Sequence, residues 1–170
     1  MQKADNKKLK ILVVDNEKDI VFFISHLLKK EGYEILKGYT AAECFSIIKD
    51  EVPDILLLDF ILPDGNGVEI CKKLKSDPRT ENIFILLLSA MNISGENMDF
   101  DPENCADDYI NKPFENRELL ARIRTYVRIK RAMMIVKQEQ EKYRLIFESN
   151  PLPMWIYDVG THGKRIRFKN

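Results

Sequence analysis

Four short apolar segments of this chain each end with or beside a single polar residue, and this pattern constrains the fold more than any other feature. The segments cover residues 11–14, 54–59, 83–88 and 109–111, and the polar residues at their ends are Asp15, Asp59, Ser89 and Lys112. In an open parallel sheet, ligands bind outside the carboxyl ends of the strands. We therefore expect these four side chains to converge on one crevice.

Segments with helical periodicity lie between the predicted strands. The first begins near Asp19 and ends at Gly32, a residue type that is typical of helix C-terminal caps. A short strand over residues 33–36 follows, and the spacing of Thr40 and Glu43 indicates a capping box at the start of the next helix. Parallel strands need crossover connections, so this alternation predicts an α/β fold with a doubly wound, five-stranded parallel sheet.

A long C-terminal helix is predicted because residues 116–148 contain neither proline nor glycine. At about 1.5 Å rise per residue it would be ~50 Å long. Leu119, Ile123 and Tyr126 have a phase that suits packing on the sheet. A heptad stripe with one polar position follows, formed by Ile129, Met133, Val136, Gln140, Tyr143 and Phe147. This stripe predicts that the helix leaves the domain and forms a parallel homodimer.

The composition excludes several classes of protein. The chain has 170 residues, with 27 Lys and Arg against 27 Asp and Glu, so no net charge favours nucleic acid or an anionic membrane. Its longest apolar run, residues 83–88, is far below the ~18 residues that a membrane span needs. Cys44, Cys71 and Cys105 lack paired spacing, which predicts free thiols and a cytoplasmic location.

Taken together and in this order, the four strand-end motifs resemble the receiver domain of two-component response regulators. The resemblance covers residues 8–127 and implies a flavodoxin-like fold. It also implies that Asp59 accepts a phosphoryl group from a histidine kinase or a phosphotransfer protein, with Mg²⁺ as the cofactor. The fragment would then be a self-phosphorylating phosphoacceptor and not an enzyme.

The resemblance assigns a role to each residue of the predicted crevice. Asp15, Asn16, Asp59 and the backbone carbonyl of Ile61 would hold Mg²⁺, which prefers oxygen ligands. Lys112 and Ser89 would bind phosphoryl oxygens. Ser89 would also form a switch pair with Tyr109, and the bond between Lys112 and Pro113 would be cis, directing the ammonium into the crevice.

Three positions depart from the receiver pattern. Asn16 stands where receivers usually carry a second acid, so it is either a weaker Mg²⁺ ligand, which Glu17 could compensate, or only a cap of the first helix. The segment 91–108 contains few apolar residues and an internal proline, which argues against a long regular helix there. Cys105 occupies a position where the family usually has glycine.

The end of the chain resembles the start of a PAS sensor domain. We expect a helical linker over residues 128–148 and a truncated PAS-like segment over residues 149–170, which is too short to be a domain. The linker would pass the phosphorylation state to this downstream region. Neither the signal sensed by that region, nor the cognate kinase, nor the output beyond Asn170 follows from the sequence.

Two other functions fit parts of the pattern. If Asn16 weakens metal binding enough, the domain would be a pseudo-receiver, a protein-interaction module that signals without phosphate. A hydrolase of the haloacid dehalogenase type also uses an aspartate nucleophile on a parallel sheet. Such hydrolases carry a second, general-acid aspartate two residues later, and here Ile61 occupies that position, which disfavours this alternative.

Overall fold

The computed structural model describes residues 8–90 and 105–149. The chain divides into two compact units, Met1–Ile129 and Lys130–Asn170. The strands are β1 (Lys10–Val14), β2 (Glu34–Gly38), β3 (Ile55–Asp59), β4 (Ile61–Leu62), β5 (Gly65–Asn66), β6 (Phe84–Ser89) and β7 (Asp108–Asn111). The helices are α1 (Lys18–Lys30), α2 (Ala41–Asp50), α3 (Gly67–Ser76) and α4 (Asn116–Ser149).

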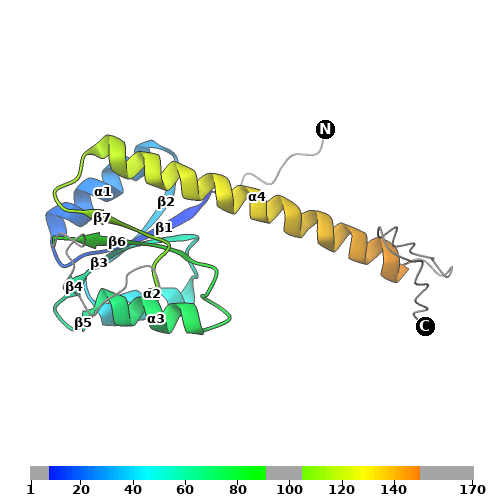
Figure 1. Cartoon of the computed structure of the whole chain (residues 1–170), viewed down its shortest axis with the longest axis horizontal. Helices are drawn as coiled ribbons and strands as arrows, with labels where there is room; N and C mark the ends of the chain where they lie inside the picture. Colours follow the sequence, from blue (N-terminus) through cyan, green and yellow to red (C-terminus); the bar gives the residue numbers. More distant parts are fainter. Residues whose placement is uncertain (1–7, 91–104, 150–170) are drawn as a thin grey trace, which may run out of the picture. The chain divides into compact units, whose positions relative to one another are not determined.

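The predicted five-stranded parallel sheet is confirmed. Its strand order is β2-β1-β3-β6-β7, and β4 and β5 form a separate antiparallel hairpin. Figure 1 shows α1 and the beginning of α4 on one side of the sheet and α2 and α3 on the other. The order places β3 at the centre, so its carboxyl end lies between those of β1 and β6.

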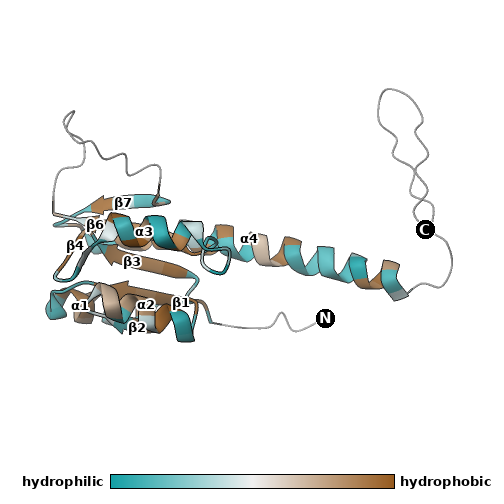
Figure 2. Cartoon of the chain, turned by 90° about the horizontal axis from the view of Figure 1, so that it is seen from below, coloured by the Kyte–Doolittle hydropathy of each residue, from teal (hydrophilic) through white to brown (hydrophobic). Residues whose placement is uncertain are grey.

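Two apolar clusters, one on each face of the sheet, form the core. The first joins alternate strand residues to α2 and α3, and the second joins the remaining strand residues to α1 and the start of α4. All five residues of β3 are buried, and Figure 2 colours this strand as largely hydrophobic. Each fully buried Leu or Ile contributes roughly 1.5–3 kcal/mol, so the central strands fix the position of their polar ends.

The helix ends agree with the sequence in part. Gly32 has φ of 89° directly after the last residues of α1, and its N–H donates to the carbonyl of Lys29 at 3.0 Å. The Thr40 hydroxyl accepts from the Glu43 N–H at 3.1 Å as a capping box requires, but the Glu43 carboxylate accepts from the N–H of Tyr39, one residue before the cap. The second strand is Glu34–Gly38, two residues longer at its end than predicted.

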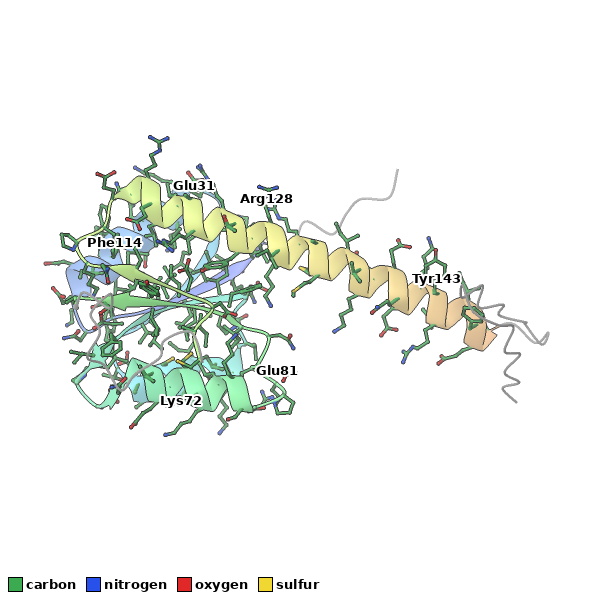
Figure 3. All side chains as sticks on the ribbon, in the orientation of Figure 1. Glu31, Lys72, Glu81, Phe114, Arg128 and Tyr143 are labelled. Atoms are coloured by element: carbon green, nitrogen blue, oxygen red, sulfur yellow. The ribbon has the colours of Figure 1, made fainter. Side chains whose placement is uncertain are left out.

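The first fourteen residues of α4 belong to the sheet-containing unit. Leu119, Ile123 and Tyr126 are buried, as their phase predicts, and the Tyr126 ring stacks on Phe84 with 5.4 Å between centroids. An ion pair of 2.9 Å joins Arg124 to Glu31, which is labelled in Figure 3. These contacts hold the start of α4 against α1 and β6.

The rest of α4 is exposed. Every residue from 131 to 149 is solvent-exposed, including Val136 at 57% and Tyr143 at 59%, and Tyr143 is labelled on the helix in Figure 3. The helix ends one residue beyond the predicted boundary. In the described part of the chain, no helix has the length and apolar character to cross a membrane.

Two predictions concern residues that the structure does not describe. The prediction against a long helix over 91–108 falls almost entirely on residues 91–104, and the PAS-like segment falls on residues 150–170. Cys105, the first residue after that gap, is buried. Cys44, Cys71 and Cys105 are all free thiols, as predicted.

Candidate functional site

The four predicted side chains meet at the carboxyl edge of the sheet. Asp15 follows β1, Asp59 ends β3, Ser89 ends β6 and Lys112 follows β7. A cavity of about 220 Å³ lies at this edge, and its lining residues are Asn16, Glu17, Asp59, Phe60, Ile61, Ser89, Ala90 and Lys112. Asp15 is fully buried beneath it. The structure therefore assembles the crevice that the strand ends predict.

Lys112 connects the two buried carboxylates. Its Nζ donates to Asp15 Oδ2 at 2.6 Å and to Asp59 Oδ1 at 2.7 Å. The side chains of Lys112 and Asp59 are only 12% and 10% exposed, and that of Asp15 is not exposed at all. The peptide bond between Lys112 and Pro113 is cis, as the resemblance implies.

Backbone hydrogen bonds fix these side chains in place. The Lys112 N–H donates to the carbonyl of Ser89 at 2.6 Å, which ties the end of β7 to the end of β6. The Phe60 N–H donates to the carbonyl of Leu88 at 2.8 Å, so the residue after Asp59 is held against β6 as well. Asp15 Oδ1 accepts from the N–H of Glu17 at 2.9 Å. Each functional side chain thus leaves a backbone that is anchored to a neighbouring strand or turn.

The buried charged groups of the site, Lys112, Asp15 and Asp59, carry more negative than positive charge. It raises the pKa of Asp59, and the hydrogen bond and charge of Lys112 oppose this rise without cancelling it. Burial acts to lower the pKa of Lys112, but its hydrogen bonds to Asp15 and Asp59 outweigh this and the pKa is raised. Two carboxylates share one ammonium, so one negative charge is not balanced. A further cation is compatible with this arrangement.

The oxygen donors of the pocket fit Mg²⁺ in kind. Asp59 supplies a carboxylate, Asn16 and Ile61 line the cavity with neutral oxygens, and the buried Asp15 carboxylate is joined to Asp59 through Lys112. In residues 8–90 and 105–149, no group of three His, Cys, Asp or Glu side chains has the arrangement of a metal site. A cation here would therefore depend on two carboxylates, backbone oxygen and water, which is a pattern that Mg²⁺ accepts.

Asn16 does not cap α1. The N-cap residue is Glu17, whose side chain makes no capping hydrogen bond, and Asn16 is an exposed residue that lines the cavity. Its alternative role as a helix cap is therefore not supported. Ile61 is 60% exposed at the opening of β4, so an apolar side chain lies at the cavity where the hydrolases would need an acid.

Tyr109 is half-buried and packs against the core cluster that contains Cys105 and residues of α3. It does not line the cavity, whereas Ser89 does, and Ser89 is fully buried. Ser89 is the last residue of β6 and pairs with Asn111, whereas Tyr109 is the second residue of the adjacent strand β7 and pairs with Leu87. The switch pair of Ser89 and Tyr109 stays a prediction.

Gly67 is a residue of the site that the sequence alone does not reveal. A Cβ at this position would overlap the carbonyl oxygen of Asp59 and lie 3.2 Å from the Cα of Phe60. The Gly67 N–H also donates to the carbonyl of Phe60 at 2.9 Å. The absence of a side chain therefore allows the start of α3 to lie directly against the backbone that carries Asp59.

Comparisons with known proteins agree with this geometry. The model of the response regulator receiver domain family matches residues 11–124. The chain is 40% identical over 118 residues to the phosphate regulon transcriptional regulatory protein PhoB of Pseudomonas aeruginosa, covering 69% of this chain and 51% of that protein. It therefore spans about half the length of this curated relative.

Solved structures show the same fold. A response regulator receiver domain protein (CheY-like) from Methanospirillum hungatei is 30% identical with a TM-score of 0.62, covering 79% of this chain and 98% of that one. The N-terminal domain of a response regulator receiver protein from Methanoculleus marisnigri is 31% identical with a TM-score of 0.56, covering 67% of this chain and 92% of that one. With the family model matching more than half of its residues, the chain belongs to the response regulator receiver domain family.

Proposed function

We propose that Asp59 is the phosphoacceptor of a two-component phosphorelay and takes its phosphoryl group from a histidine kinase or a phosphotransfer protein. The observation that carries this proposal is the placement of Asp59 at the end of the central strand, in the cavity, with Oδ1 2.7 Å from Lys112 Nζ. The carboxylate is accessible from the cavity, and Asp15 beneath it is not. Asp59 is therefore the better nucleophile of the two.

The transfer needs little covalent help from the protein. An Asp59 carboxylate oxygen attacks the phosphorus of a phosphohistidine, a new P–O bond forms, and the P–N bond breaks with its electron pair passing to the imidazole nitrogen. Lys112 would move its hydrogen bond from Asp59 to a phosphoryl oxygen while it keeps Asp15. Ser89 would donate a hydrogen bond from its hydroxyl to another phosphoryl oxygen, and the ring of Tyr109 would turn inward behind it.

Mg²⁺ would be held by Asp15, Asn16, Asp59 and the carbonyl of Ile61. When bound, it supplies positive charge to the transferring phosphoryl group. Support for this ligand set comes from the unbalanced negative charge of the pocket, where one ammonium faces two buried carboxylates. Asn16 offers a neutral oxygen, so binding should be weaker than in a site with a third carboxylate.

We further propose the domain organisation and the route of the signal. Residues 8–127 would be the receiver, residues 128–148 a helical linker, and residues 149–170 the start of a PAS-like domain in a cytoplasmic signalling protein. The exposed apolar stripe of α4 from Ile129 to Phe147 supports a homodimer through the linker, because a parallel partner helix would cover it.

Labelling of the chain with a small-molecule phosphodonor such as acetyl phosphate tests the phosphoacceptor. In the presence of Mg²⁺, mass spectrometry should place the added phosphate on Asp59, and Asp59→Asn should abolish the labelling. Asp50→Asn is the matched control because Asp50 is an exposed acid at the end of α2. Equal labelling of the native chain and the Asp59→Asn variant would refute the proposal.

The alternative function is a pseudo-receiver that binds partners without phosphate. The observation in its favour is that Asn16, a neutral residue, lines the cavity beside the two carboxylates. Binding of beryllium fluoride in the presence of Mg²⁺ separates the two functions, because this complex mimics the phosphoryl group. A chain that neither binds beryllium fluoride nor accepts phosphate would be a pseudo-receiver.

A further inference from the structure

Two of the four N–H groups in the first turn of α2 donate to a residue that is distant in the sequence. Within α2, the hydroxyl of Thr40 accepts from the Glu43 N–H at 3.1 Å, and the carbonyl of Thr40 accepts from the Cys44 N–H at 3.0 Å. The other two N–H groups of this turn, those of residues 41 and 42, donate to the carboxylate of Asp64 at 2.7 Å and 2.9 Å. Asp64 thus completes the N-terminus of a helix that begins more than twenty residues earlier.

Asp64 lies in the turn of the β4–β5 hairpin, and this hairpin begins two residues after Asp59. Ile61 opens the hairpin and pairs with Asn66 across it. At the base of the hairpin, the Gly67 N–H donates to the carbonyl of Phe60 at 2.9 Å, and Asn66 caps α3 by accepting from the Val68 N–H at 2.8 Å. The hairpin is therefore fixed at its base to the Asp59 loop and to α3.

The tip of the hairpin lies close to α2. A Cβ on Gly65 would be 3.1 Å from the Cβ of Ala41, which is tighter than ordinary contact. The two hydrogen bonds of Asp64 hold this approach, and they lower the pKa of its carboxyl group through the backbone N–H groups of Ala42 and Ala41. An ionised carboxylate at a helix N-terminus is also favoured by the helix dipole.

We propose that Asp64 is a positioning residue for the metal site: by tying the hairpin tip to α2, it fixes the backbone carbonyl of Ile61. This inference rests on the proposed function, in which that carbonyl is a Mg²⁺ ligand. Asp64 itself is exposed and does not line the cavity. Its effect on Mg²⁺ therefore has to pass through the hairpin backbone.

Thr40 provides a matched control. Thr40→Ala removes the side-chain acceptor of one N–H group in the first turn of α2 and Asp64→Ala that of two, so both variants weaken the capping of this helix. Only Asp64 also holds the hairpin that carries Ile61. A difference in Mg²⁺ affinity between the two variants therefore reports positioning and not helix capping.

The experiment is a titration of Mg²⁺ into the native chain and three variants, followed by calorimetry or by amide chemical shifts. We expect Asp64→Ala to weaken Mg²⁺ binding on the order of 10-fold, the size seen when the support of a metal ligand is removed. Asp64→Asn, which keeps one acceptor oxygen, should recover part of the loss. Thr40→Ala should bind near the native affinity.

Two results would overturn the inference while leaving the proposed function intact: native affinity in Asp64→Ala, or an equal loss in Asp64→Ala and Thr40→Ala. Phosphodonor labelling of Asp59 in the native chain would still show the phosphoacceptor in either case. A native chain that binds no Mg²⁺ would overturn both the inference and the metal site on which it rests.

Discussion

Substituting Gly67 with alanine tests how closely α3 approaches the phosphoacceptor. Gly67 is the first residue of α3, where helix propensity alone predicts that alanine stabilises the protein by up to about 1 kcal/mol. The structure predicts the opposite sign, because the new Cβ would overlap the Asp59 carbonyl oxygen and crowd the Phe60 Cα at 3.2 Å. Backbone atoms cannot rotate away as a flexible side chain can. Overpacking of this kind costs typically about 1–3 kcal/mol.

Gly38→Ala is the matched control for this substitution. Gly38 is also buried at the carboxyl edge of the sheet, but a Cβ there would meet its neighbours at 3.4–3.7 Å, within ordinary contact. Urea unfolding should show a loss of stability for Gly67→Ala and a change of less than about 1 kcal/mol for Gly38→Ala. The phosphodonor labelling of Asp59 should also slow in Gly67→Ala. A Gly67→Ala variant that is as stable as the native chain would refute the close approach.

Three further predictions follow from the site and from α4. Asp59→Asn should raise the free energy of unfolding at pH 7, measured by urea unfolding, because burial raises the pKa of Asp59 and its charge therefore costs stability as pH rises through the folded pKa. This gain should vanish at acidic pH, where the carboxyl group is protonated in both the folded and the unfolded state. Asn16→Asp should tighten Mg²⁺ binding in a calorimetric titration, because a carboxylate attracts a hard cation more strongly than an amide; unchanged affinity would exclude Asn16 as a ligand. Light scattering should show a mass above that of a monomer for the whole chain and a monomer mass for a chain that ends at Ile129. Monomer masses for both chains would refute the helix dimer.

The crevice could be predicted because its residues are determined by local patterns. Asp15, Asp59 and Ser89 each lie at the end of an apolar run, and strand order in a parallel sheet brings such ends together. The start and end of α4 follow from the absence of proline and glycine over many residues. Propensity and periodicity act over short distances along the chain, so a single sequence records them directly.

Other parts of the site depend on contacts that no local pattern encodes. Gly65 and Gly67 indicate only a relaxed loop when the sequence is considered alone, whereas in the structure each is a point of close approach to another element. Asp64 caps a helix from more than twenty residues away, and Asn16, which has the residue type of a helix cap, is not one. These features depend on how the hairpin and the helices meet, which is a property of the assembled fold.

Lys112 shows why the fold and the chemistry of this site are difficult to separate. It lies 97 residues from Asp15 and 53 from Asp59 along the chain, so the charges meet only when the sheet is complete. Removing one partner of a buried ion pair typically costs about 3–5 kcal/mol, because the remaining charge is left without compensation. A change at Lys112 would therefore weaken folding and phosphoryl transfer together. Asn16 is exposed and lines the cavity, and its substitution unpairs no buried charge, so its effects on Mg²⁺ and on phosphate can be assigned to the chemistry.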